Sequence, residues 1–90
     1  MKHLYPNSEN KDMPTILEVR GYKFKFFSNE NDELPHIHIV KGEGHSKIWL
    51  EPAVRVEYSY NFTVRENRDI WNLVSKNRET FKRAWDEFFT

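Results

Sequence analysis

Hydrophobic and polar residues alternate with a period of two along the N-terminal half of the chain, which is the pattern of strands with one buried face. We predict a β-hairpin over residues 15–27, with its turn at Arg20-Gly21. A two-residue loop there gives the cross-strand pairs Val19 with Tyr22, Leu17 with Phe24 and Thr15 with Phe26. The opposite face then pairs Glu18 with Lys23, two opposite charges, which supports this register.

A second hairpin is predicted from Pro35–Lys41 and His45–Leu50, joined at Gly42 and Gly44, which we expect to supply positive φ. The expected cross-strand pairs are Val40 with His45, His38 with Lys47 and His36 with Trp49. The other face carries only apolar residues, namely Ile37, Ile39, Ile48 and Leu50. We therefore expect the apolar face to be buried. A further strand is predicted over Val54 to Tyr60.

The hydrophobic period lengthens to that of a helix after Phe62. Thr63 and Glu66 form a capping box, which predicts that a helix begins there. The expected apolar stripes are Ile70, Leu73 and Val74 in one helix and Phe81, Ala84, Trp85 and Phe88 in a second, over Arg78 to Phe89. The pattern leaves open whether Asn77 separates the helices. We predict an α+β fold: a twisted antiparallel sheet of about four or five strands, two hairpins plus a strand, with two C-terminal helices packed on one face.

The first residues are polar and predict a flexible tail over residues 1–12, followed by a single domain over residues 13–90. Pro14 disfavours helix at Met13 and favours extended chain. The sequence is compatible with a natural start at either Met1 or Met13.

Composition narrows the classes of function. The 90 residues carry 14 basic and 14 acidic side chains, which argues against a broadly basic nucleic-acid binder. There is no cysteine, which excludes disulfides and thiolate chemistry, and no run of about 18 apolar residues that could span a membrane. We expect a cytoplasmic protein without a cofactor. High aromatic content at zero net charge is compatible with homo-oligomerisation.

The histidines His36 and His38 carry the most concentrated chemistry, because residues at i and i+2 of a strand share one face. With His45 they could ligate a transition metal, but such a site needs further ligands. A carboxylate from the acidic stretch Ser28–Glu33 would have to fold over, and this stretch is interpreted as a solvated turn that lacks the spacing of a calcium loop. No metal site is assigned.

Three other interpretations of the two histidines stay open. They could act as acid and base in phosphodiester cleavage, with Lys47 stabilising negative charge. The face could instead recognise a partner or RNA, with Trp49 stacking and the cations contacting phosphates. They could also be structural. The candidate binding residues beside them are Trp49, His45, Lys23 and Lys25. On the first helix, Trp71 is either a core residue or an exposed anchor for a partner.

Several segments together resemble the domain-of-unknown-function family numbered 4160, a small bacterial family. These are Met13-Pro14-Thr15-Ile16, the hairpin to Ser28-Asn29, Pro35-His36-Ile37-His38, Lys47-Ile48-Trp49-Leu50-Glu51-Pro52 and Ala84-Trp85-Asp86-Glu87-Phe88-Phe89. The resemblance implies a gene that stands beside a second small gene, in an arrangement like that of toxin–antitoxin pairs. It implies no established activity.

The leading hypothesis is therefore a protein- or RNA-binding component of a two-gene, toxin–antitoxin-like module, with a small partner protein encoded nearby. One alternative is an RNA-cleaving toxin that uses His36 and His38 as its acid–base pair. A second alternative is a histidine-ligated metal-binding domain.

Overall fold

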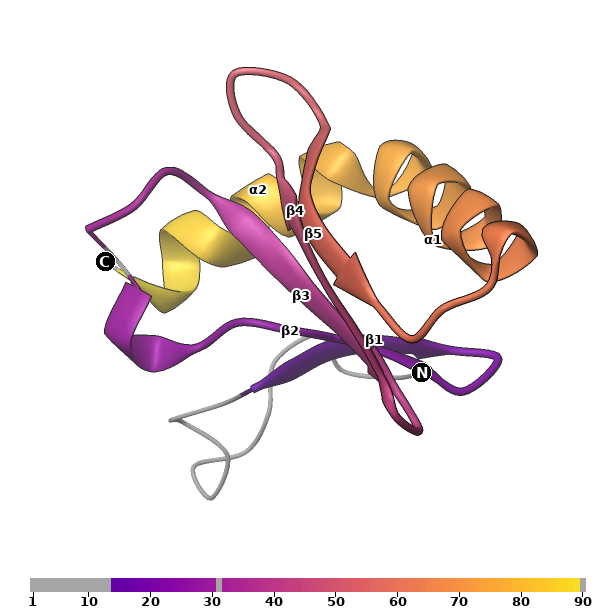
Figure 1. The fold of residues 1–90 in the computed structure, drawn as a ribbon. Helices are drawn as coiled ribbons and strands as arrows, with labels where there is room; N and C mark the ends of the chain where they lie inside the picture. The colour runs from indigo at the N-terminus through magenta and orange to yellow at the C-terminus, as the bar shows by residue number, and fades with distance from the viewer. Residues whose placement is uncertain (1–13, 31, 90) are drawn as a thin grey trace.

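A computed structural model describes residues 14–30 and 32–89 and consists of one five-stranded antiparallel sheet followed by two helices (Figure 1). The strands are β1 (Thr15–Val19), β2 (Tyr22–Lys25), β3 (His36–Lys41), β4 (Gly44–Trp49) and β5 (Arg55–Tyr60). The helices are α1 (Val64–Lys76) and α2 (Arg78–Phe88), and a short 3-10 helix, η2, covers Ser28–Glu30. The strands lie in the sheet in the order in which they occur in the chain. The predicted α+β fold is confirmed, and the predicted tail lies outside the described residues.

The β1–β2 hairpin follows the predicted register near its turn and departs from it at its open end. Val19 pairs with Tyr22 and Glu18 with Lys23, as expected. The predicted pair of Thr15 with Phe26 is wrong, because Thr15 pairs with Lys25. The register shifts at Ile16, and this irregularity turns the Ile16 side chain into the core, where it is fully buried.

The β3–β4 hairpin has the predicted register throughout, including His36 opposite Trp49 and His38 opposite Lys47. Gly42 has the expected positive φ of 56°, whereas Gly44 does not belong to the residues with positive φ. Gly44 serves a different purpose, because the ring of Phe62 occupies the place where a Cβ atom would lie. The glycine thus lets the chain before α1 approach the hairpin closely.

Local backbone and side-chain interactions define the start of α1 and the boundary between the two helices. The Thr63 hydroxyl accepts a hydrogen bond from the Glu66 amide at 3.0 Å, and the Thr63 amide donates to the Glu66 carboxylate at 2.9 Å, which confirms the capping box. The chain leaves helical geometry at Asn77, so the two helices are separate. Neither helix is long and apolar enough to cross a membrane.

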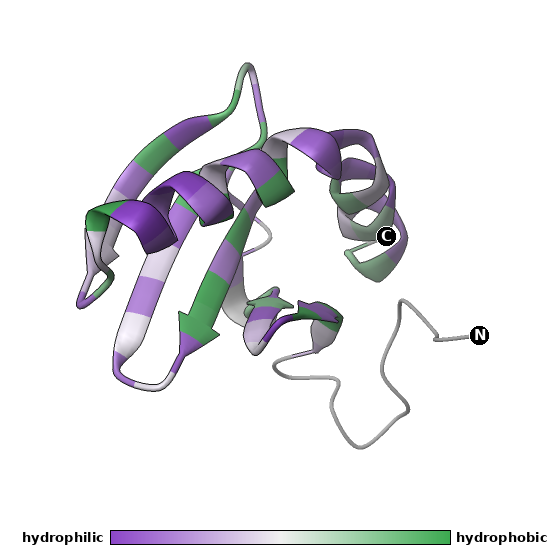
Figure 2. Ribbon diagram, turned by 90° about the vertical axis from the view of Figure 1, so that its right-hand side faces the viewer, coloured by the Kyte–Doolittle hydropathy of each residue, from purple (hydrophilic) through white to green (hydrophobic). Residues whose placement is uncertain are grey.

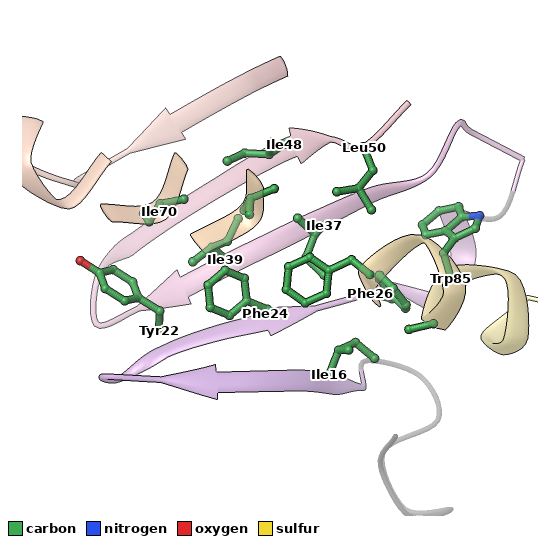
Figure 3. Close-up of a cluster of buried hydrophobic side chains, with 13 residues drawn as sticks. Ile16, Tyr22, Phe24, Phe26, Ile37, Ile39, Ile48, Leu50, Ile70 and Trp85 are labelled. Carbon is green, nitrogen blue, oxygen red and sulfur yellow. The ribbon is translucent and has the colours of Figure 1, made fainter. Parts of the chain in front are cut away.

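The face of the sheet that the helices cover is called the inner face (Figure 2), and its side chains form the core (Figure 3). Bands of hydrophobic and hydrophilic residues alternate along the strands, as Figure 2 shows. Phe24 stacks on Phe81 with ring centroids 5.4 Å apart, and Phe26 meets Trp85 edge-on at 5.3 Å. The buried apolar residues are Ile16, Tyr22, Phe24, Phe26, Ile37, Ile39, Ile48, Leu50, Ile70, Val74, Phe81, Ala84 and Trp85. Trp71 is 41% exposed and lies outside this core.

Candidate functional site

The opposite side of the sheet, called the outer face, collects the candidate residues through its strand register. Lys25 lies opposite His38, and His38 lies opposite Lys47. Directly paired residues of an antiparallel ladder point to the same side. The outer face therefore carries Lys23, Lys25, His36, His38, His45, Lys47 and Trp49, together with Tyr58 and Tyr60 of β5.

The segment between β2 and β3 folds over part of the outer face and buries the histidines. His36 is 0% and His38 1% exposed. The ring of Phe27 lies flat on His38, with centroids 3.9 Å apart and planes 5° from parallel. The stretch Ser28–Glu33 was expected to be a solvated turn, but its η2 helix points Glu30 at the histidines, and the Glu30 side chain is only 18% exposed. That expectation is wrong for Glu30.

One carboxylate oxygen joins the two histidines. Glu30 Oε1 lies 2.6 Å from His36 Nε2 and 2.7 Å from His38 Nε2. The other ring nitrogens are also bonded, since His36 Nδ1 lies 2.9 Å from the Leu34 carbonyl oxygen and His38 Nδ1 lies 3.0 Å from His45 Nε2. These residues form what is called the Glu30–His36–His38 cluster.

The hydrogen-bond partners and the pKa shifts assign the protons of this cluster. Burial raises the pKa of Glu30, but hydrogen bonds from His36 and His38 outweigh it and hold that pKa below its usual value. Burial lowers the pKa of His38 to about 4 against the opposing effect of Glu30. His38 is therefore neutral at pH 7, so it donates from Nε2 to ionised Glu30, and its Nδ1 accepts from His45. Both ring nitrogens of His36 face acceptor oxygens, those of Leu34 and Glu30.

The rim of the cluster is held by a second pair of charges. Lys47 Nζ donates to Glu33 Oε1 at 2.8 Å and lies 4.7 Å from the centroid of the Trp49 ring. Burial lowers the pKa of Lys47, but the hydrogen bond from Lys47 to Glu33 and the nearby carboxylate charges raise it more, so Lys47 is charged. Lys47 and Glu33 thus pin the end of the covering segment to β4.

The part of the outer face beyond the covering segment presents aromatic rings and lysines. Tyr58 and Tyr60 are stacked with centroids 5.1 Å apart, and Tyr60 is 60% exposed. His45 meets Tyr58 edge-on at 5.3 Å. On β2 and β3 there is a shallow depression of about 240 Å³, lined by Gly21, Lys23, Lys25, Val40, Lys41 and Gly42.

Sequence reasoning did not select Glu30, Glu33, Phe27, Tyr58 or Tyr60 as site residues. An available signal was the short separation of Glu30 from the histidines, six and eight residues, across a connection that joins neighbouring strands. The alternation of β5 also puts Tyr58 and Tyr60 on one side. Both signals are indirect, because acidic residues in a loop are far more often solvated.

The same cluster has the composition of a metal site. Glu30, His36 and His38 each offer one ligand atom, and these atoms all lie within 4.8 Å of one another. Two imidazole nitrogens and a carboxylate oxygen are ligands that zinc and iron take in proteins.

Comparison with known proteins identifies a family and nothing narrower. The sequence matches the family model described as Domain of unknown function (DUF4160) over residues 21–86. No curated protein and no solved structure gives a significant match. The matched region runs from the start of β2 into α2 and contains the cluster and the rest of the outer face.

Proposed function

The chain belongs to the DUF4160 family, and we propose that it is an RNA-binding component of a two-gene, toxin–antitoxin-like module. The observation that carries this proposal is the open part of the outer face, where stacked tyrosines on β5 and a lysine-lined depression on β2 and β3 belong to the same sheet. Both helices pack on the other side of the sheet, so neither covers these rings (Figure 1).

Stacking supplies the affinity that does not depend on sequence. Unpaired bases stack on exposed aromatic rings, and each such contact contributes about 1–3 kcal/mol. Tyr60 is 60% exposed and lies against Tyr58, which in turn contacts His45. The three rings give an aromatic platform on two adjacent strands.

Charge supplies the attraction to the phosphates. Lys23, Lys25 and Lys41 line the depression, so a local cationic surface exists although the chain as a whole is neutral. Lys47 and the histidines were candidate phosphate contacts, but Lys47 is paired with Glu33 and His36 and His38 are buried. Phosphate contact in this proposal therefore belongs to the lysines of the depression.

The geometry favours binding over cleavage by His36 and His38. A general acid or base must come within hydrogen-bond reach of the group it protonates or deprotonates. These two imidazoles are 0% and 1% exposed, and their four nitrogens already have partners within the protein.

The small partner protein encoded nearby belongs to the same proposal and rests on the family resemblance. One observation suits it: Val64 and Trp71 of α1 are 78% and 41% exposed. Residues seven apart lie on the same side of a helix, two turns from each other. Both side chains belong to a helix that packs on the inner face, whereas the RNA platform lies on the outer face.

Fluorescence anisotropy with a labelled single-stranded RNA, measured at several salt concentrations, tests the proposal. The Tyr58→Leu, Tyr60→Leu double variant should bind at least about tenfold more weakly. The Lys23→Ala, Lys25→Ala double variant should lower the dependence of log affinity on log salt by about 1.4, roughly 0.7 for each phosphate that is no longer neutralised. Trp71→Leu is the control and should bind RNA as the wild type does.

Equal binding by the wild type and the tyrosine variant would contradict the RNA platform. Absence of RNA binding together with co-purification of the neighbouring gene's product would move the proposal to a purely protein-binding component.

A further inference from the structure

We propose that Glu30, His36 and His38 bind one divalent first-row transition-metal ion, for which Zn²⁺ and Co²⁺ serve as probes. This site lies under the covering segment, and none of its three ligands belongs to the RNA platform. The inference goes beyond RNA binding and stands or falls independently of it.

The ligand set is assembled from two elements that the fold brings together. His36 and His38 project from the same side of β3, and Glu30 reaches them from η2. The three ligand atoms are His36 Nε2, His38 Nε2 and Glu30 Oε1, and the carboxylate oxygen lies within 2.7 Å of both nitrogens. Two histidines and one carboxylate, with the remaining positions open, form a common transition-metal site.

The second nitrogen of each imidazole already lies within hydrogen-bond distance of a partner that could accept from it when an ion is bound. His36 Nδ1 donates to the Leu34 carbonyl at 2.9 Å, which directs Nε2 toward Glu30. With an ion at its Nε2, His38 would donate from Nδ1 to His45 Nε2, which lies 3.0 Å away. Histidine ligands in metal sites almost always donate their other N–H to such a partner, which fixes the ring orientation.

The neighbouring rings hold both imidazoles in place. Phe27 stacks flat on His38 at 3.9 Å, and Trp49 and Trp85 contact His36 edge-on or tilted at 5.2 and 5.0 Å. The ligands are therefore oriented before an ion arrives, which lowers the cost of assembling the site.

Small movements within the cluster make room for the ion, because the three ligand atoms already lie within 4.8 Å of one another. Ligand atoms at about 2.0–2.2 Å from a shared metal lie roughly 3.0–3.5 Å from one another. The carboxylate oxygen, now at 2.6 and 2.7 Å from the nitrogens, must retreat by under about 1 Å. Glu30 stands on a short 3-10 helix between strands, so it can move without disturbing the ladder of β3.

The experiment uses the full chain, treated with a chelator and then titrated with Co²⁺ and Zn²⁺. We expect one Zn²⁺ per chain by elemental analysis after dialysis, and a visible absorption band of bound Co²⁺ that saturates at the same ratio. Glu30→Gln keeps the shape of the side chain but removes the charged ligand, and should weaken binding at least about tenfold. Asp32→Asn, which changes an exposed carboxylate in the same segment, is the matched control and should bind as the wild type does.

A second measurement keeps the test independent of the folding of the variants. Nitrogen-15 NMR spectra of the wild-type imidazoles report which ring nitrogens an ion touches. Addition of Zn²⁺ should shift the Nε2 signals of His36 and His38. No bound ion, an ion bound equally well by Glu30→Gln, or shifts confined to the other histidines would overturn the proposal.

Discussion

Strand β3 buries the side chains of both its faces, but by different means. Ile37 and Ile39 on the inner face are 0% exposed, and His36 and His38 on the outer face are 0% and 1% exposed. The isoleucines are covered by two helices, whereas the histidines are covered by a short connection from which the Glu30 carboxylate reaches both of them. Side chains that are equally buried are therefore stabilised in two different ways, by apolar packing on the inner face and by hydrogen bonds on the outer face.

The two kinds of stabilisation differ in whether they depend on the direction of a contact. Apolar burial stabilises by about 25 cal/mol for each Å² removed from water, whatever the exact contact. The histidines gain their stability only while Glu30 accepts from both, because a buried polar group without a partner costs about 1–3 kcal/mol. The inner face should therefore tolerate changes of shape that keep the side chain apolar, while the outer face should not tolerate the loss of a single acceptor.

The largest expected effect concerns Trp85, which is 5% exposed and contacts Phe26 on the inner side and His36 on the outer side. Trp85→Ala should lower the free energy of unfolding by about 3–5 kcal/mol, because it removes a buried ring that supports both faces. Urea unfolding measures the change. Trp71→Ala is the control, and its cost should stay near ~1 kcal/mol because that ring is 41% exposed. Similar costs for the two variants would contradict the placement of both helices.

The second prediction concerns the pH dependence of stability, to which the outer-face residues His38 and Glu30 contribute. The folded protein holds the pKa of His38 at about 4, below its ordinary value of 6.5. Between these two pH values His38 is therefore protonated in the unfolded chain but neutral in the folded chain. Stability should therefore fall as the pH decreases from 6.5 to about 4, by at most about 3 kcal/mol for this residue. The depressed pKa of Glu30 adds a further loss below 4.5. Urea unfolding of the chelator-treated protein across this range measures the slope.

The control for this slope replaces His38 by phenylalanine, which does not titrate. His38→Phe should flatten the dependence of the unfolding free energy on pH between 6.5 and about 4 relative to the wild type. An unchanged slope in His38→Phe would show that the buried imidazole is not the source.

The third prediction compares one conservative change on each face. Glu30→Gln should cost about 1–3 kcal/mol, because the amide cannot accept the two histidine bonds as the carboxylate does. Ile39→Val on the inner face should cost only about 0.5–1.5 kcal/mol. Thermal unfolding of the metal-free variants measures both. A larger loss for Ile39→Val than for Glu30→Gln would reverse the comparison.

The smallest expected effect lies on the hairpin of β1 and β2, where Glu18 lies opposite Lys23. A double-mutant cycle with Glu18→Ala and Lys23→Ala should give a coupling energy of about 0.2–1 kcal/mol. Added salt should lower it, because exposed charges are screened. A coupling well above ~1 kcal/mol would show that this pair is less accessible to solvent than the exposed positions of Glu18 and Lys23 indicate.

Local patterns were enough to predict most of the fold. Alternation along β3 and β4 fixed their register, since a shift by one residue would have placed Ile37 and Ile39 on the polar side. The capping box at Thr63 and Glu66 fixed the start of α1, because both partners lie within one helical turn. In each case the deciding contact lies close in the sequence or repeats with a simple period.

The features that could not be predicted depend on contacts that leave no trace in the hydrophobic periodicity of the sequence. The irregularity at Ile16 breaks the alternation of β1, and Gly44 is required by the ring of Phe62, which arrives from the far end of β5. The prediction of the candidate site was incomplete for a similar reason. It found the histidines but not Glu30, which lies in a stretch of acidic and amide residues whose composition is that of a solvated turn. The role of Glu30 depends on the position of η2, which brings its carboxylate to the two histidines.

The strand order has a kinetic consequence. Every ladder of the sheet joins strands that are neighbours in the chain, and Glu30 lies only six and eight residues from the histidines it binds. Domains whose contacts are local in sequence fold faster than those that must close long loops. The β2–β3 hairpin and its cluster should therefore assemble early, before α2 docks. Substitutions at Glu30 should then slow folding, whereas substitutions in α2 should chiefly speed unfolding.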